Sequence, residues 1–405
     1  MRNSNSNRVS NAFYNIIAAI VVLIICCFSQ PVQKVCHAEA TVEEQLDQEV
    51  NLILDDIDMS ELENYFENNK EYFASTFNVF SFKDFVLALI RGEILTDYNS
   101  IFSAILGTIR RNFTQIMSPL LTILIIIMLA VLFKIVKPKL EESSVSRAIF
   151  FICYSSVIIV LASLMHGVSN NVYSVISNMH SQSASVLPII LFAMNLAGGS
   201  VSVKAYQPMV ILLSNLVSTI FLKILFPLAV AIFVLSIISH LSTKMKLNNL
   251  IDFFKSLFKW IIGIVFTIYI GFMTIQGITA SSADGISIKT AKYAIKNYVP
   301  MLGGYISDGF ELVRAGAVII KNAVGFAGIA MLVGSIISPI LLIATLQLAL
   351  KFLSGIVEPL SDSKVTSIIS SASSSLSMML TVLIGVFLMF FVSNMLLMVS
   401  LSGVI

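Results

Sequence analysis

The ionisable residues that could do chemistry gather in one polar stretch, residues 276–325, of an otherwise apolar chain. Asp284 is a suitable N-cap for the helix that we expect to follow it. On that helix Lys289, Lys292 and Lys296 are three and four residues apart and therefore share one face. A basic amphipathic helix of this kind lies on lipid headgroups. The alternative, which the sequence leaves open, is that the helix lines a polar cavity or docks a partner.

More polar side chains follow towards the next apolar segment. Asp308, Glu311 and Arg314 are three residues apart on a predicted helix. Lys321 and Asn322 enter the apolar run behind it, where an ionisable residue is a candidate functional residue. We expect the aliphatic stem of Lys321 to carry its ammonium group to the interface, and asparagines to hydrogen-bond neighbouring helices. The candidate residues for polar lining or partner docking are Asp284, Lys289, Lys292, Lys296, Asp308, Glu311, Arg314, Lys321, Asn215 and Asn322.

No catalytic or cofactor motif accompanies these residues. The sequence contains neither a GxxxxGK[ST] phosphate loop nor an HExxH zinc helix. His166, His180 and His240 occur singly, without a cysteine or carboxylate spaced to form a site with them. We therefore expect no enzymatic activity, no cofactor and no metal. Nucleic acid is not an expected partner either, because no basic patch interleaved with aromatic residues occurs outside the membrane flanks.

Composition requires that the elements that position these residues lie in lipid. Hydrophobic residues make up 57% of the chain and charged residues 12%, whereas soluble domains have roughly 45–50% and about 25%. A span needs about 20 mainly apolar residues. The candidate spans are 117–136, 148–168, 224–241, 260–279, 317–337, 339–356 and 377–401, with 186–203 and 208–222 shorter or interrupted. The predicted fold class is all-α, a polytopic transmembrane bundle of about seven to eight spans.

The amino-terminal part predicts export. Residues 1–38 read as a signal peptide, with basic residues, an apolar run and small residues before a cleavage site; an uncleaved signal anchor is the alternative. Residues 39–116 form an acidic segment rich in phenylalanine, which we expect to be extracytoplasmic. It is either a small helical domain with its own core or a partner-binding amphipathic surface. Residues 117–405 form the polytopic domain. If the leader is removed, Cys153 remains as a single thiol.

Lysine and arginine predict the orientation of the spans. They flank the loops near 137–147 and 242–259, which we therefore expect to be cytoplasmic. The uncharged loop 166–185 suits the outside. The loop 357–376 has one lysine and two acidic residues and so shows no excess of lysine or arginine, and the side of the C-terminus stays open.

Prolines recur at equal distances. Pro188 and Pro227 are 39 residues apart, and so are Pro300 and Pro339. Chance is the alternative, because proline is common in the first turn of a span. The repeats that this spacing predicts are residues 148–259 and 260–371. Interrupted helices are typical of the sites of secondary transporters, and the expected breaks or re-entrant points are Pro188, Gly198, Gly199, Pro227, Pro300, Gly303, Gly304 and Pro339.

The stretch QGITASSADGISIKTAKYAIKNYVP, followed by SDG and VIIKNAVG, resembles the stage III sporulation protein AE family of endospore-forming bacteria. The resemblance extends along nearly the whole chain, including the FPL at 226–228 and the serine-lysine loop at 242–246. It implies a multi-pass protein of the mother-cell (outer forespore) membrane, needed for late forespore gene expression. The implied partners are other stage III sporulation A-operon proteins, ATPase-like and ring-forming, and through them the forespore stage II sporulation protein Q.

Three functions are compatible with these observations. The first is a membrane subunit of a secretion-like or feeding channel between mother cell and forespore, as the resemblance implies. The second is a solute or ion transporter recruited to that complex, which the apparent repeat favours. The third is a non-conducting scaffold for the ring proteins. Interrupted helices with a polar lining favour the first two functions, and a fully packed interior favours the third.

Overall fold

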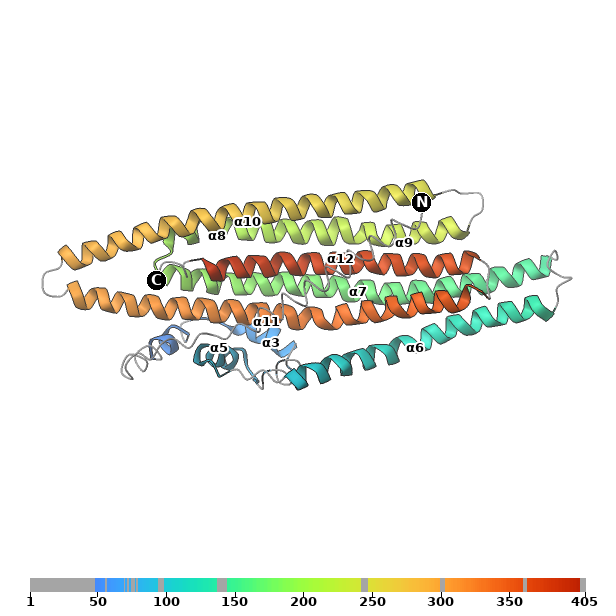
Figure 1. Cartoon of the computed structure of the whole chain (residues 1–405), viewed down its shortest axis with the longest axis horizontal. Helices are drawn as coiled ribbons and strands as arrows, with labels where there is room; N and C mark the ends of the chain where they lie inside the picture. Colours follow the sequence, from blue (N-terminus) through green and yellow to red (C-terminus); the bar gives the residue numbers. More distant parts are fainter. Residues whose placement is uncertain are drawn as a thin grey trace. The chain divides into compact units, whose positions relative to one another are not determined.

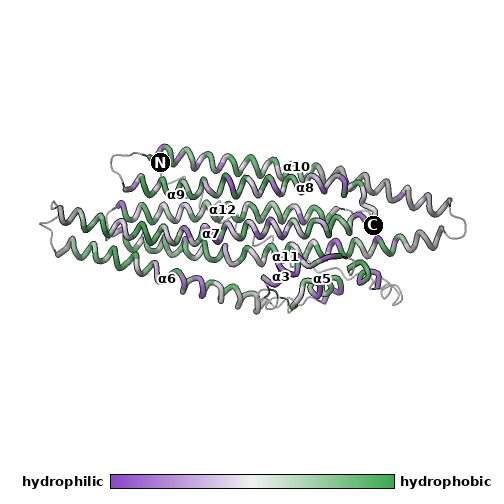
Figure 2. Tube along the Cα trace, turned by 180° about the vertical axis from the view of Figure 1, so that it is seen from behind, coloured by the Kyte–Doolittle hydropathy of each residue, from purple (hydrophilic) through white to green (hydrophobic). Residues whose placement is uncertain are grey.

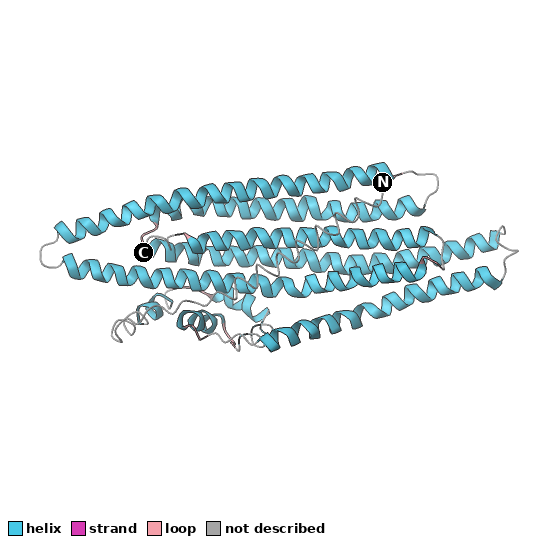
Figure 3. Ribbon diagram, in the orientation of Figure 1, coloured by secondary structure: helices cyan, strands magenta, loops and turns pink. Residues whose placement is uncertain are grey.

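The computed structural model describes most of the chain, and within the described residues every regular element is a helix (Figure 3). The described residues are 48–54, 57–68, 70, 73, 77, 79–93, 98–136, 144–241, 247–298, 303–359 and 363–400. The helices are α3 (Ser60–Asn68), α5 (Phe82–Arg91), α6 (Tyr98–Val136), α7 (Ser144–Leu196), α8 (Ser200–Ile220), the π-helical turn η2 (Phe221–Leu225), α9 (Phe226–Leu241), α10 (Asn248–Tyr298), α11 (Gly303–Val357) and α12 (Ser363–Val399). The expected signal peptide, 1–38, lies outside the described residues.

Six helical segments of the described chain are long and apolar enough to cross a membrane. They are Ile105–Phe133, Ala148–Leu196, Ser200–His240, Asn248–Met273, Gly309–Val357 and Lys364–Val399. Figure 2 shows hydrophobic residues along every long helix, with hydrophilic residues interspersed along α7. The all-α polytopic bundle is therefore confirmed, with fewer and longer spans than the sequence suggested. The runs 317–337 and 339–356, for example, belong to one helix.

Most of the expected proline breaks are absent. Pro188 lies inside α7 and Pro339 inside α11, and both helices continue through them. Packed neighbouring helices can compensate for the hydrogen bond that a proline removes, so long apolar helices tolerate it. Before Pro227 the chain forms the turn η2 instead, in which the Phe226 N–H donates to the Phe221 carbonyl, five residues back. The wider turn makes room for the proline ring without ending the helical path.

The expected break at Gly198 and Gly199 is present. Gly198 has φ 85°, a left-handed conformation that favours glycine. Its N–H donates to the Asn195 carbonyl at 3.0 Å, and the Gly199 N–H donates to the Met194 carbonyl at 2.9 Å. This pair of bonds is a Schellman motif, and it closes α7 before the chain reverses into α8. Gly303 and Gly304 begin α11 rather than interrupt a helix; Pro300 lies outside the described residues.

The polar segment 166–185, expected to be an external loop, is instead helical and belongs to α7. Its buried residues Val168, Val172, Ile176 and Met179 recur at helical spacing and pack on the other helices. Packing of this apolar stripe outweighs the low helix propensity of the serines and asparagines around it. The segment was misassigned because its uncharged polar residues lower the mean hydropathy without interrupting the helical periodicity.

The expected domain border at 116–117 does not coincide with a helix end. Position 116–117 falls inside α6, which runs without interruption from Tyr98 to Val136. The two proposed repeats both contain a hairpin of long helices, but their matching prolines differ in place. Pro188 lies inside α7, ahead of the α7–α8 turn, whereas α10 ends at Tyr298 and α11 begins at Gly303, on either side of Pro300.

Helix α12 is the most buried of the six and lies beside α7 and α11 (Figure 1). It runs antiparallel to α11, since Lys321 hydrogen-bonds the end of α12 and the Gln347 amide donates to Ser377 near its start, at 2.6 Å. Helices α9 and α10 also pack on α12. At Gly385 an added Cβ would lie 2.8 Å from the Phe221 ring, so glycine permits this close approach.

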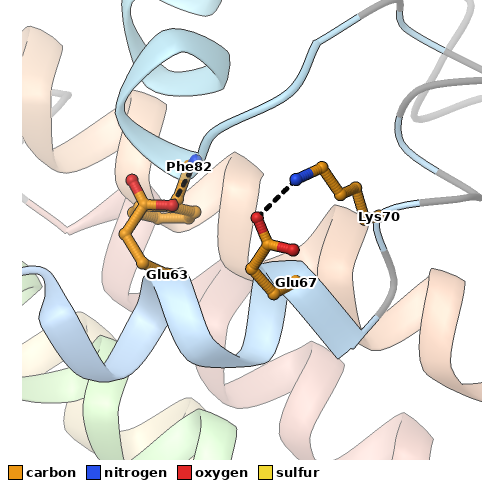
Figure 4. Close-up of polar contacts among 4 residues, drawn as sticks. All are labelled: Glu63, Glu67, Lys70 and Phe82. Atoms are coloured by element: carbon orange, nitrogen blue, oxygen red, sulfur yellow. Dashed lines mark hydrogen bonds and ion pairs between the residues drawn. The ribbon is translucent and has the colours of Figure 1, made fainter.

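The amino-terminal segment 48–92 has a core of its own. Its buried aromatic residues are Phe66, Phe73, Phe77, Phe82 and Phe85. The contacting ring pairs among Phe66, Phe73, Phe77 and Phe85 have centroids 4.6 to 6.4 Å apart. The Glu63 carboxylate of α3 accepts a 2.9 Å hydrogen bond from the N–H of Phe82 at the start of α5 (Figure 4). It also accepts a 3.1 Å hydrogen bond from the N–H of Lys83. Five phenylalanines of the segment therefore form a core, whereas Phe80 is 59% exposed.

This segment also contacts the long helices. Ile53 and Val50 lie 3.8 Å from the position that a Cβ on Gly316 of α11 would occupy. The Ser185 hydroxyl of α7 donates to the Glu61 carboxylate at 2.6 Å. The segment is thus attached to α7 near its C-terminal end and to α11 near its N-terminal end.

Helices α7, α10 and α11 are much longer than a bilayer is thick. They have 53, 51 and 55 residues, and at 1.5 Å per residue each is about 75 Å or more in length. The hydrocarbon core is about 30 Å thick, so at least about half of each helix lies outside it. On α7 and α10 many exposed large apolar side chains lie towards the lysine-flanked starts, namely Phe151, Ile152, Ile159, Leu250, Phe253, Trp260 and Ile264. On α11 the exposed Leu348 and Phe352 lie towards the C-terminal end.

Candidate functional site

Lys321 on α11 is fully buried, contrary to the expectation that it reaches the interface. Its Nζ donates to the backbone carbonyl oxygen of Met398 at 2.7 Å and to that of Ser400. These carbonyls close α12, where the last turn of a helix has unsatisfied acceptors and a partial negative charge. The ammonium group therefore has strong acceptors within the protein, and reaching solvent would give up both bonds.

A set of close contacts, which we call the polar junction, joins α7, α11 and α12 around this lysine. Its members are Gln182, Met194, Lys321, Gly328, Met398 and Ser400. The Gln182 amide of α7 donates to the Gly328 carbonyl at 3.2 Å, and the Ser400 hydroxyl contacts the Met194 sulfur at 3.6 Å. A Cβ on Gly328 would lie 3.0 Å from Val186, so the small residue lets α11 approach α7. The polar junction therefore stabilises the packing of α7, α11 and α12 against one another.

A second polar feature, the α7–α8 groove, is a cavity of about 530 Å³ between the two helices that meet at the Gly198 turn. Its lining residues are His180, Ser183, Ala184, Leu187, Pro188, Leu191, Phe192, Asn195, Val203, Gln207, Ile211, Ser214 and Asn215. The lining contains no aspartate, glutamate, lysine or arginine. An ionic ligand would therefore be poorly solvated there, whereas an uncharged polar ligand could hydrogen-bond to hydroxyl and amide groups.

Two residues give the groove a defined polar wall. The His180 Nδ1 lies 2.8 Å from the Ser218 hydroxyl of α8, and its ring centroid is 6.1 Å from that of Phe390. The Ser183 hydroxyl is buried and has no hydrogen-bond partner. A buried hydroxyl without a hydrogen bond costs free energy unless a ligand binds it. Ser183 is therefore the residue of this groove whose hydroxyl would gain most from a hydrogen bond to a ligand.

The structure does not bring the predicted site residues together in one place. Asn215 and Pro188 line the α7–α8 groove, and Lys321 lies in the polar junction. Asn322 is half-buried, with its Oδ1 unpartnered; Arg314 is buried, while Lys289 and Glu311 are exposed. The side chains of Asp284, Lys292, Lys296 and Asp308 lie outside the described residues.

Asp284 does not begin a helix, contrary to expectation. Helix α10 starts at Asn248 and continues through Asp284 to Tyr298. The polar stretch after the apolar run 260–279 contains no proline before Pro300, so nothing in it terminates the helix. The three lysines therefore lie on the extension of a membrane helix and not on a separate surface helix.

Several residues of these two sites were missed from sequence. Gln182, His180 and Ser183 lie in the segment 166–185, where the lack of charge predicts a loop and hides the helical spacing that α7 shows. The sequence feature that points to them is the pair of polar side chains Gln182 and His180 within a helical stripe of buried apolar residues. Ser400 could not have been found, because its role depends on a lysine 79 residues away along the chain.

In the described chain no group of three histidine, cysteine, aspartate or glutamate side chains could hold a metal ion. Long apolar helices, a packed centre and uncharged polar contacts define the class: a polytopic α-helical membrane protein. The chain belongs to the stage III sporulation protein AE family, whose model matches residues 80–401. It is 27% identical, over 272 residues, to stage III sporulation protein AE of Bacillus subtilis (strain 168), covering 67% of this chain and 68% of the relative.

No solved structure matches the chain. The family membership expected from the central motif is confirmed, and it makes the chain a sporulation-related membrane protein.

Proposed function

We propose that this protein is a membrane subunit of a transenvelope channel complex between mother cell and forespore, needed for late forespore gene expression. Helix length is the observation that supports this proposal most directly. Helices α7 and α11 are more than twice as long as the hydrocarbon core is thick. A subunit of an assembly that crosses the space between two membranes needs such a rigid extension beyond its own bilayer.

The proposed location is the mother-cell (outer forespore) membrane, with the amino-terminal segment outside the mother-cell cytoplasm. The lysine-flanked loops after α6 and α9 would be cytoplasmic by the positive-inside rule. Segment 48–92 contacts α7 near Ser185, far along that helix from its lysine-flanked start. It contacts α11 near Gly316, close to the α10–α11 connection, which follows the end of α10 opposite its lysine-flanked start. Six antiparallel spans would also leave the C-terminus on the same side as that segment.

The proposed partners are the ATPase-like and ring-forming proteins of the same operon and, through them, the forespore stage II sporulation protein Q. This chain would supply no catalytic activity of its own. The polar surface of α7 suits contact with other proteins or water: His166, Asn170, Asn171, Ser174 and Asn178 are all exposed. A lipid-facing helix surface would carry apolar residues at these positions.

A non-conducting scaffold is the second candidate function, and the packing of α12 favours it over a pore through a single chain. Leu376, Leu380, Leu383 and Phe387 are at most 2% exposed and fill the space towards its neighbours. A passage, if the complex has one here, would run between subunits. The α7–α8 groove is the observation that favours the third candidate, a transporter of uncharged polar solutes.

Cysteine accessibility tests the proposed extension. In a background with Cys26, Cys27, Cys36 and Cys153 changed to serine, Asn171→Cys should react with a membrane-impermeant thiol reagent added from outside the mother-cell cytoplasm. Ile152→Cys, an exposed apolar position on the same helix, is the matched control and should stay unlabelled. Equal protection of both positions would place the middle of α7 in lipid and remove the main support for the proposal.

A deletion separates the scaffold from the transporter. Removal of residues 41–110 takes away the segment that contacts α7 and α11. It should abolish sporulation if that segment holds other components of the complex. Normal sporulation with a stably inserted deletion variant would argue for a transporter that works without it.

A further inference from the structure

Helix α6 has one apolar stripe along its length, of which only half is covered. Eight positions repeat with alternating spacings of four and three residues: Phe102, Leu106, Ile109, Phe113, Ile116, Leu120, Ile123 and Ile127. This is the a/d pattern of a coiled coil. The last four side chains are at most 8% exposed and pack within the bundle, whereas the first four are 36 to 66% exposed. We call these first four residues the α6 stripe.

Lipid does not account for most of the α6 stripe. Arg110 and Arg111 are exposed in its middle, and arginine in a membrane helix is placed at the headgroup level or beyond. About 35 Å of helix separates Arg111 from Lys134, at 1.5 Å per residue, which matches the thickness of a hydrocarbon core. Phe102, Leu106 and Ile109 therefore lie beyond the hydrocarbon core, where an exposed apolar stripe marks a contact with another protein.

We propose that the α6 stripe is a self-association surface, covered by the α6 stripe of a second copy of this chain in a parallel pair. Copies in one membrane share their orientation, so their α6 helices are parallel. A parallel pair is the geometry in which a/d positions meet their own equivalents. The seam would continue, towards the amino-terminal end of α6, the packing that Ile116 to Ile127 already make inside each chain.

The charge pattern of α6 is compatible with this pairing. With Leu106 and Phe113 at a and Phe102 and Ile109 at d, Arg110 occupies an e position. In a parallel pair it faces the g position of the other copy, which is Ile105. The two arginines do not meet, and the stem of each can cover the isoleucine opposite. Membrane insertion already restricts the rotation of both copies, so a short seam loses less freedom on pairing than it would in solution.

Disulfide trapping in membranes tests the proposal. In the background without native cysteines, Leu106→Cys should form a disulfide-linked dimer when a mild oxidant is added. Gly107→Cys is the matched control, because it is exposed, a Cβ there meets nothing within 4 Å, and it lies off the seam. We expect at least a fivefold higher dimer yield from Leu106→Cys. Co-expression of two copies with different tags should give a mixed dimer, which identifies the second copy as the partner.

Two results would overturn the proposal. One is an equal dimer yield at positions 106 and 107, which indicates random collision. The other is a crosslinked product of Leu106→Cys that contains a different protein. A second variant controls for misfolding. Ile109→Gln should lower the dimer yield from Phe113→Cys at least threefold. The melting temperature of the monomer in detergent should not change. The outcome does not depend on whether the assembly conducts, so it is separable from the test of the proposed function.

Discussion

The Nζ atom of Lys321 donates a 2.7 Å hydrogen bond to the backbone carbonyl of Met398, 77 residues further along the chain. The contact joins α11 to the last turn of α12, and the side chain is completely buried. A lysine in such a place marks either a functional proton site or a structural cap. Its two acceptors are backbone carbonyls at the end of α12, so the lysine acts as a cap of that helix.

Lys321→Met should destabilise the protein. The substitution keeps the length of the side chain but leaves the carbonyls of Met398 and Ser400 without their donor. We expect a loss of about 1–3 kcal/mol, the usual cost of unsatisfied buried acceptors. Unfolding in a graded series of detergent and SDS mixtures would measure it. Lys204→Met, on an exposed part of α8, should have no effect, and equal midpoints for the two variants would contradict the capping role.

Gly385→Ala should be destabilising despite the higher helix propensity of alanine. The new Cβ would lie 2.8 Å from the Phe221 ring and 3.3 Å from that of Phe266, so both rings must move. Overpacking of this kind costs about 1–3 kcal/mol. Gly263→Ala in α10 is the control, because a Cβ there meets nothing within 4 Å. Thermal unfolding in detergent should place the Gly385 variant below wild type and the Gly263 variant at or above it.

Glu63→Ala should loosen the amino-terminal segment. Its carboxylate accepts hydrogen bonds from two N–H groups at the start of α5, which the helix itself cannot satisfy. Loss of such a cap costs about 0.5–2 kcal/mol. Hydrogen exchange should become faster across α5. The comparison is Glu67→Ala, which removes only an exposed ion pair of 2.6 Å with Lys70, worth about 0–1 kcal/mol; equal exchange in both variants would show that Glu63 is not a cap.

These results show which parts of the structure the sequence could predict. Composition requires a membrane bundle, and the pair Gly198–Gly199 predicted a helix end because a left-handed residue is needed there. Prolines were misleading, since whether Pro188 or Pro339 breaks a helix depends on the neighbours that pack around it. The position of Lys321 was also beyond prediction, because its acceptors come from the far end of another helix and no local pattern points to them.

Acid should weaken the start of α3. The Ser60 N–H donates to the Asp58 carboxylate at 3.0 Å, and this bond, with one from the Ser60 hydroxyl, lowers the pKa of Asp58 below its model-peptide value of 3.8. A lowered folded-state pKa means that the ionised form stabilises the fold above the unfolded-state pKa. That contribution is lost as pH falls through the lower folded-state value. The protection factors of the α3 amides, which correct for the intrinsic pH dependence of exchange, should therefore fall below about pH 4 in wild type and lose that acid-dependent component in Asp58→Asn. An identical acid response of both proteins would contradict the assignment.

Ser183→Ala should separate a binding role of the α7–α8 groove from a structural one. The hydroxyl is buried and unpartnered, so its removal should leave stability unchanged or slightly higher. Ser218→Ala is the matched comparison, because it loses the 2.8 Å contact with His180 and should cost about 0.5–1.5 kcal/mol. Sporulation frequency is then compared at equal protein levels. A tenfold or greater loss in the stable Ser183 variant would show that the hydroxyl binds a solute or partner during sporulation. Wild-type sporulation would assign the groove to packing alone and favour the scaffold over the transporter.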